Sequence, residues 1–148
     1  MIESEEIVKL FHCCIVILLS MENKNKKFLQ LNDISAYKSS FHLSNYIWNI
    51  VTVWDYFSKD TVGKQFVRAT DSISANIAEG FGRFGKKDKI KFYYYSFGSI
   101  KESLDWNEKS FKRGLIREDQ YLYIFQELNK LPKDIHFLIK YTGEKLTI

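Results

Sequence analysis

The sequence predicts an all-α fold, an up-down-up-down antiparallel four-helix bundle, from three observations. The chain of 148 residues has one proline and seven glycines, which favours long uninterrupted helices. Four segments repeat hydrophobic residues at alternating steps of three and four, and none sustains the period-two alternation of a strand. Short connections between such segments favour antiparallel neighbours, which gives the bundle its topology.

Each predicted helix is defined by the positions that would face its neighbours in the bundle. Helix by helix, these positions are Leu43, Ile47, Ile50, Trp54 and Phe57; Phe66, Thr70, Ile73, Ile77 and Phe81; Ile90, Tyr93, Phe97, Ile100, Leu104, Asn107 and Phe111; and Tyr121, Ile124, Leu128, Leu131, Ile135 and Leu138. The tyrosines at 93–95 favour a strand by propensity, but the helical period around them prevails.

The connections are predicted from polar residues and glycines. Residues 58–63 are polar, and Asp60 or Thr61 would cap the second helix there. Three glycines between residues 80 and 85 separate the second helix from the third.

The last two helices carry an end signal and a conflict. Gly114 follows two cations, as is typical of a helix C-terminus. Pro132 lies inside the fourth hydrophobic pattern, so it should kink that helix or split it near Leu131.

Residues 1–31 are predicted to be an N-terminal extension and linker, and residues 32–148 to be the bundle. The hydrophobic run at 13–19 is shorter than the roughly 20 residues that cross a membrane. Glutamates precede it, where a secretory signal would be basic. We therefore expect no membrane association.

The cysteines indicate the compartment. Cys13 and Cys14 are adjacent and cannot cross-link distant parts of a fold, which predicts the reducing cytoplasm. His12 beside them suggests a metal site, but no pair of ligands has the spacing of a zinc site. We therefore expect neither a metal nor another cofactor.

The net charge of +4 is concentrated in one short stretch, which we call the basic segment. Its cations are Arg83, Lys86, Lys87, Lys89 and Lys91. Together with Asp88 they account for the whole excess, since the rest of the chain is balanced. A local positive field of this kind attracts a polyanion, although lysines in a turn also serve simply to solvate it.

The same region contains a misleading motif. Residues 80–85 match G-x-G-x-x-G, but a helix precedes them where a dinucleotide site needs a strand. Their backbone amides, beside lysines at the start of the third helix, would suit a phosphate instead. No nucleophile elbow or H-E-x-x-H occurs, and Glu79 with Glu102 fits a cap or salt bridge better than a catalytic pair. We expect no catalytic residues and no enzyme.

Two features leave alternatives open. Asn107 is either a position at the solvent edge or a polar register contact between helices or subunits. The second helix is rich in small residues, which indicates either tight packing inside one bundle or a subunit interface. The small residues are Ala69, Ser72, Ser74, Ala75, Asn76 and Ala78.

A family resemblance rests on two motifs in the right order. Residues 72–83 read S-I-S-A-N-I-A-E-G-F-G-R, and residues 98–102 read G-S-I-K-E after a basic connector. They resemble the four-helix bundle family encoded in intervening sequences of bacterial 23S ribosomal RNA genes, over about residues 32–143. Ser74 stands where that pattern usually has proline, and Pro132 interrupts a helix that is unbroken in the family.

The resemblance implies a left-handed bundle that assembles as a homopentamer, without catalysis. The chain also looks like accessory proteins of diversity-generating retroelements, which bind nucleic acid and a reverse transcriptase. By position, Asn76, Glu79 and Gly80 would be structural or subunit-contact residues. Arg83, Lys86 and Lys87 would be the basic edge of the bundle.

Two functions are therefore expected. The first is a non-enzymatic oligomer that binds RNA or another nucleic acid through the basic segment. The alternative is an interaction scaffold that docks a partner protein, such as a reverse transcriptase, through exposed aromatic residues. The candidates for that surface are Trp48, Phe92, Tyr94 and Tyr95.

Overall fold

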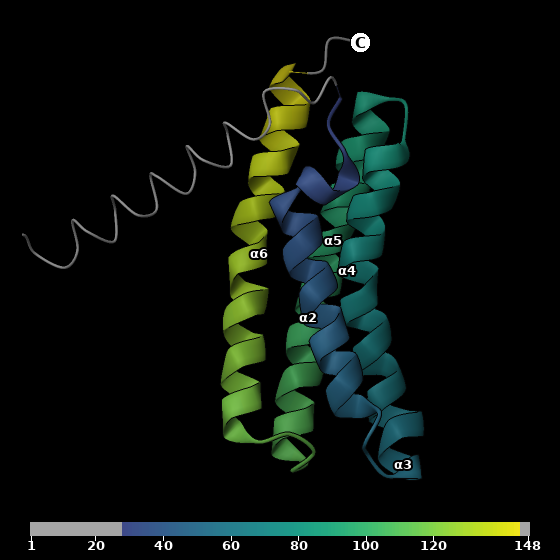
Figure 1. The fold of residues 1–148 in the computed structure, drawn as a ribbon, viewed down its shortest axis with the longest axis vertical. Coiled ribbons are helices and arrows are strands. Elements are labelled where there is room, and N and C mark those ends of the chain that lie inside the picture. Colours follow the sequence, from purple (N-terminus) through teal and green to yellow (C-terminus); the bar gives the residue numbers. More distant parts are fainter. Residues whose placement is uncertain (1–27, 146–148) are drawn as a thin grey trace, which may run out of the picture. The chain divides into compact units, whose positions relative to one another are not determined.

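A computed structural model describes residues 28–145 (Figure 1). The chain divides into two units after Gln30, so the bundle from Leu31 onward is described by itself. The predicted extension and the group His12, Cys13 and Cys14 lie outside the described residues. The boundary predicted at residue 31 stays a prediction.

Four long helices form the bundle. They are α2 (Ser35–Val51), α4 (Lys64–Gly82), α5 (Lys86–Lys112) and α6 (Glu118–Lys145). Shorter helical pieces are η2 (Leu31–Asp33), α3 (Tyr56–Ser58) and the π-helical turn η3 (Lys59–Gly63). Consecutive long helices pack together and α6 packs back against α2, which confirms the predicted all-α bundle (Figure 1).

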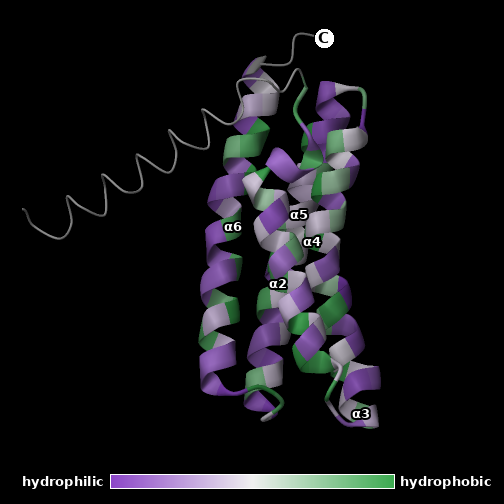
Figure 2. Cartoon of the chain, in the orientation of Figure 1, coloured by the Kyte–Doolittle hydropathy of each residue, from purple (hydrophilic) through white to green (hydrophobic). Residues whose placement is uncertain are grey.

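The core is built from the predicted helix faces, except that Phe57 lies beyond the end of α2 and is exposed. One isoleucine from each long helix lies at the centre and is almost completely buried, and these are Ile47, Ile73, Ile100 and Ile124. Hydrophobic and hydrophilic bands alternate along the helices in Figure 2, as expected when one side of each helix packs inward. No helix in the described part of the chain is long and apolar enough to span a membrane.

The first connection lies earlier than predicted. Helix α2 ends at Val51, and Asp55 caps α3 by accepting the backbone N–H of Ser58 at 3.0 Å. The expected break at residues 58–63 is helical and leads directly into α4. Gly63 was misleading because it is buried, and a Cβ there would lie 2.5 Å from Val51 Cγ1. It permits close contact of helices rather than a turn.

Helix α6 runs through Pro132 without a break, so the expected split is wrong. Proline removes one backbone N–H donor and crowds the preceding turn. Leu128, Leu131 and Ile135 on either side are buried in the core. Their packing holds the helix together across the lost hydrogen bond.

The face of α5 that is buried in the bundle contains many polar side chains. Its buried positions include four serines, Ser96, Ser99, Ser103 and Ser110. Ser103 and Ser110 donate their hydroxyls to carbonyls of their own helix at 2.7 Å, and Ser96 donates to the carbonyl of Ile73 on α4 at 3.3 Å. Small, internally satisfied side chains let α4 approach closely. This contact positions the α4–α5 turn.

Candidate nucleic-acid interface

The basic segment forms the turn between α4 and α5. Helix α4 ends at Gly82, Arg83 follows in extended conformation, and α5 begins at Lys86. A connection of three residues forces the two helices to be antiparallel. All five predicted cations therefore lie at, or within the first two turns after, one end of α5.

Two of these cations form hydrogen bonds within the bundle. Lys86 Nζ donates to the carbonyl of Gly143 in the last turns of α6 at 2.5 Å. Lys89 Nζ donates to the carbonyl of Phe81 in the last turn of α4 at 2.7 Å. Both ammonium groups sit at helix C-termini, where unpaired carbonyls favour a cation. Partial burial lowers the pKa of the Lys89 ammonium.

Arg83 is also engaged. Its guanidinium forms an ion pair with Glu79 one turn earlier, and its Cζ lies 4.6 Å from the centre of the Phe92 ring. The ion pair neutralises part of the positive charge of Arg83, and the contact with the ring orients its guanidinium. Glu79 therefore forms a salt bridge next to the turn, which is one of the two structural roles expected for it.

Lys87 and Lys91 are the cations that point outward. Both are exposed and lie one turn apart on α5. Lys91 Nζ is 5.9 Å from the centre of the Tyr95 ring, and within residues 28–145 neither lysine forms an ion pair. Tyr94 and Tyr95 lie one turn further along the same face. We call this surface the exposed stripe of α5, and it consists of Lys87, Lys91, Tyr94 and Tyr95.

The residues assigned by resemblance lie where α4 meets α5. Asn76 Nδ2 donates to Ser99 Oγ at 3.4 Å. Gly80 is buried, and a Cβ there would lie 2.6 Å from the Tyr93 ring and 2.9 Å from the carbonyl oxygen of Lys89. Both residues hold the two helices together. Their role in contacts between subunits stays a prediction.

Asn107 lies inside the bundle, not at the solvent edge. Its side chain is fully buried, and Nδ2 donates to the carbonyl of Tyr121 at 3.1 Å. Among the described residues its Oδ1 has no hydrogen-bond partner. This hydrogen bond joins α5 to the start of α6, so Asn107 is a polar contact between helices. Its role in setting the register stays a prediction.

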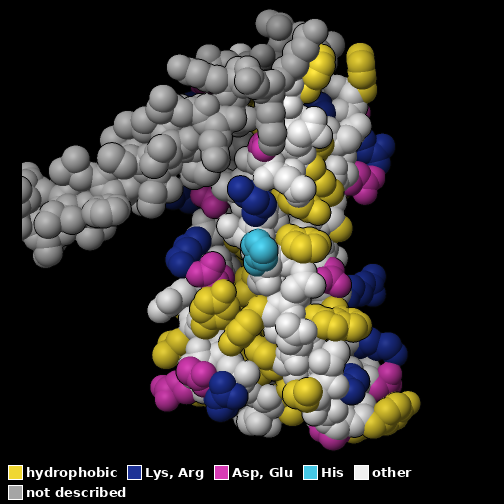
Figure 3. Space-filling model, in the orientation of Figure 1, with side chains coloured by type: hydrophobic (Ala, Val, Ile, Leu, Met, Phe, Trp, Pro, Cys, Tyr) yellow, Lys and Arg dark blue, Asp and Glu magenta, His cyan; other side chains and the backbone are white. Residues whose placement is uncertain are grey.

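The aromatic residues of the scaffold alternative do not form one surface. Phe92, Tyr94 and Tyr95 lie on α5, whereas Trp48 lies on α2. Trp48 borders a mainly apolar groove of about 510 Å³ between α2 and α4, whose lining includes Val67. Figure 3 shows hydrophobic side chains gathered on this side of the bundle with charged side chains around them.

The small residues of α4 lie in two different environments. Ala69 and Ser74 are buried within the bundle. Ala75 and Ala78 border the open groove system beside α2. The buried pair contributes to tight packing inside the bundle. The expectation that small residues of α4 form a subunit interface stays a prediction.

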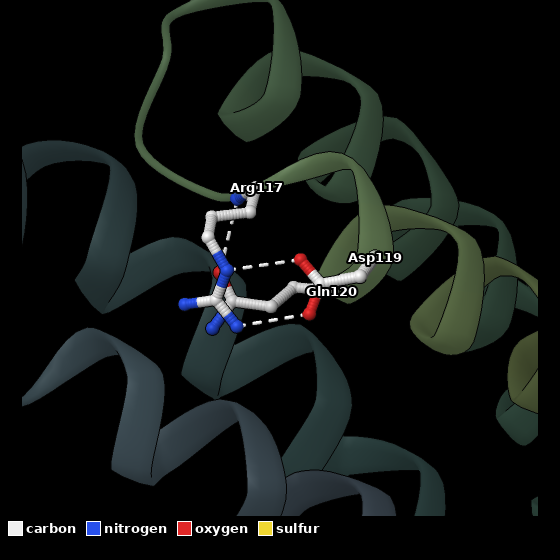
Figure 4. Close-up of polar contacts among 3 residues, drawn as sticks. All are labelled: Arg117, Asp119 and Gln120. Atoms are coloured by element: carbon white, nitrogen blue, oxygen red, sulfur yellow. Dashed lines mark hydrogen bonds and ion pairs between the residues drawn. The ribbon is translucent and has the colours of Figure 1, made fainter.

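The opposite end of α5 is closed by a polar cap that the sequence reasoning missed (Figure 4). The backbone N–H of Arg117 donates to Gln120 Oε1 at 3.0 Å, and its guanidinium donates to both carboxylate oxygens of Asp119 at 2.9 Å. The guanidinium lowers the pKa of Asp119. Gln three positions after the cap was the available signal, but the cap is arginine rather than serine or threonine.

The site therefore offers charge and exposed rings. Within the described residues, no group of three or more His, Cys, Asp or Glu is placed to hold a metal ion. The outward lysines suit phosphate groups, and the rings beside them suit flat apolar surfaces.

The fold and its charged end define a class of all-α proteins, four-helix bundles with a cationic turn between their second and third long helices. Residues 32–136 match the family described as 23S rRNA-intervening sequence protein, and the chain belongs to that family. The resemblance inferred from residues 72–83 and 98–102 is thereby confirmed.

A solved structure supports the fold. It is a protein of unknown function from the S23 ribosomal protein family of Bacteroides thetaiotaomicron, 23% identical to this chain with a TM-score of 0.65. The match covers 71% of this chain and 98% of the other. At this identity the likeness bears on the fold alone. A search of curated proteins finds no match.

Proposed function

We propose that this protein is a cytoplasmic, non-enzymatic, oligomeric bundle that binds RNA or another nucleic acid through the α4–α5 turn. The observation that carries the proposal is the pair of outward lysines, Lys87 and Lys91, within the segment that holds the whole net charge of the chain. Lysines of this kind contact phosphates with little dependence on base sequence.

Assembly would strengthen this weak contact. The family resemblance implies five copies, and a ring of five would present five pairs of outward lysines to one polyanion. Linked contacts raise the apparent affinity because each later contact forms at a high effective concentration. The groove beside Ala75 and Ala78 offers a surface through which copies can pack.

A salt series tests the proposed site. We compare the wild-type protein with a Lys87→Gln, Lys91→Gln double variant in binding to a structured RNA. Each lost phosphate contact reduces the slope of log affinity against log salt by about 0.7 to 0.9. The double variant should therefore show a clearly shallower slope, with its helical circular dichroism unchanged.

A matched control removes the same charge elsewhere. Lys59 and Lys133 are exposed and lie outside the turn, on η3 and α6. A Lys59→Gln, Lys133→Gln variant should keep nearly the wild-type slope. If the slope of log affinity against log salt falls equally in both double variants, binding follows net charge and the α4–α5 turn is not the site.

A second candidate function is docking of a protein partner, and the exposed Trp48 beside the apolar groove favours it. Tryptophan is a frequent anchor at protein interfaces. Trp48→Ala should then abolish capture of the purified partner, such as a reverse transcriptase, after nuclease treatment. Unchanged capture by this variant would remove the groove from consideration.

A further inference from the structure

We infer that the nucleic acid bound at the turn is single-stranded, and that its bases stack on the tyrosines of the exposed stripe of α5. The inference rests on the proposed function and names the form of its ligand. The stripe combines two chemistries that a folded bundle does not itself use there. Its lysines suit phosphates, and its rings suit the faces of unpaired bases.

The rings are exposed far beyond what the fold requires. The residue exposure is 57% for Tyr94 and 47% for Tyr95. Steps of three and four residues place them on the same side of α5 as Lys87 and Lys91. Along the stripe, the two lysines therefore lie nearer the α4–α5 turn and the two tyrosines lie further from it.

Neighbouring rings hold the two tyrosines in place. Tyr95 meets the half-buried Phe92 edge to face, with ring centres 5.5 Å apart. Tyr94 meets the half-buried Phe97 with ring centres 6.1 Å apart. Each tyrosine thus has one supported side and remains accessible to solvent, so a stacking base would order little that is not already ordered.

A glycine keeps the stripe open. Gly98 lies one turn after the tyrosines, and a Cβ there would meet nothing within 4 Å. Side chains in a helix lean toward its N-terminus, so a larger residue at this position would lie over the surface near Tyr94 and Tyr95. Packing does not demand glycine at this place, and its absence of a side chain leaves room beside the rings.

A third ring lies in the turn itself. Phe84 follows Arg83 and is 84% exposed. A phenylalanine this exposed gains nothing from the core, whereas a stacked base would remove its ring from water. Rings thus occur on both sides of Lys87 along the chain.

The combination favours a single strand over the other polyanions. Bases in a duplex are already stacked on each other, so exposed rings add nothing to its binding. Lysine is depleted at the cores of protein interfaces, which makes a protein partner a poorer match to this surface. An unpaired strand uses both the lysines and the rings.

The test measures selectivity with intact protein. The probes are an oligoadenylate strand and an RNA hairpin duplex with the same number of phosphates. A Tyr94→Leu, Tyr95→Leu variant should bind the single strand at least about fivefold more weakly, since each base–ring stack accounts for about that factor or more. Its affinity for the duplex should stay within about twofold of wild type. The matched control, Tyr94→Phe with Tyr95→Phe, keeps the rings and should keep wild-type affinity for both probes.

A second variant acts without removing any ring. Gly98→Leu should also weaken single-strand binding selectively, because its side chain covers the space beside the tyrosines. Equal losses on strand and duplex, or no loss in either variant, would overturn the inference. So would a change in mass in solution without a change in selectivity, which would make the rings a contact between copies.

The two proposals fail in different ways. If the salt series still implicates Lys87 and Lys91 while the tyrosine variants bind like wild type, the proposed function stands and the stacking inference falls. If wild-type protein binds neither probe, the proposed function itself falls. Capture of a protein partner that depends on Tyr94 and Tyr95, with unchanged strand binding, would assign the stripe to that partner instead.

Discussion

Two glycines show how differently a single methyl group can act in this bundle. At Gly80 a Cβ would press on the Tyr93 ring and on the Lys89 carbonyl, whereas at Gly98 it would meet nothing. Gly80→Ala should lower the free energy of unfolding by about 1–3 kcal/mol through overpacking. Gly98→Ala should raise it by up to about 1 kcal/mol, because alanine favours the helix. Urea unfolding of both variants measures the difference, and shifts of the same sign would contradict it.

Asn107 carries a cost inside the core. Its Oδ1 is buried without a partner within the described residues, and such a group costs about 1–3 kcal/mol. Asn107→Leu should therefore leave the free energy of unfolding unchanged or raise it. Asn107→Asp should lower it, increasingly as the pH rises and the buried carboxyl ionises. Thermal unfolding over a pH series gives both values. A strongly destabilised leucine variant would show that the hydrogen bond to Tyr121 outweighs the cost of the unpartnered Oδ1.

Asp71 predicts a dependence of stability on pH. Partial desolvation in the groove raises the pKa of its carboxyl above 3.8, although the Ser44 hydroxyl opposes the shift. A raised pKa in the folded state means that stability falls as the pH rises through that pKa. Asp71→Asn should raise the urea midpoint at neutral pH and leave it nearly unchanged well below pH 3.8. An equal effect at both pH values would show that charge is not the cause.

Among the helices, α6 accommodates Pro132 in its interior because the residues around it are packed in the core. Pro132 has no backbone N–H, so the carbonyl of Leu128 lacks its usual donor within the helix. Leu128 itself is buried in the core. Pro132→Ala should restore that hydrogen bond and raise the free energy of unfolding by about 1–3 kcal/mol. Chemical denaturation is the measurement. A loss of stability would mean that the helix has shaped its contacts around the ring.

The elements could largely be predicted from hydrophobic periodicity. The faces centred on Ile73 and Ile124 are as expected, because the core of a bundle requires one apolar side per helix. Besides Pro132, two local features departed from the expectation. Gly63 resembled a turn residue but serves close packing. The buried serines of α5 carry no hydrophobic signal, although Ser96 and Ser99 contact α4.

The candidate site was predictable only in part. Charge clustering located the α4–α5 turn, and the lysines do lie there. Which of them point outward depends on carbonyls at the ends of α4 and α6, and these reach the turn only through folding. Sequence spacing therefore could not separate Lys87 from Lys86, although they are neighbours in the chain.

At the scale of the whole molecule, assembly should control affinity. If five copies associate, sedimentation equilibrium should give a mass near five times 17.6 kDa. Diluting the protein until the assembly dissociates should weaken RNA binding steeply, because linked contacts are lost together. A particle of monomer mass whose affinity is the same at every dilution would contradict this prediction.

The hydrogen bond from Lys86 to Gly143 ties the turn to the far end of the chain. A cut by a protease just after Thr142 would remove the acceptor and free this ammonium to join the outward pair. The number of cations available at the turn therefore depends on whether the carbonyl of Gly143 is present. A truncation that removes Gly143 would therefore change the charge presented at the α4–α5 turn.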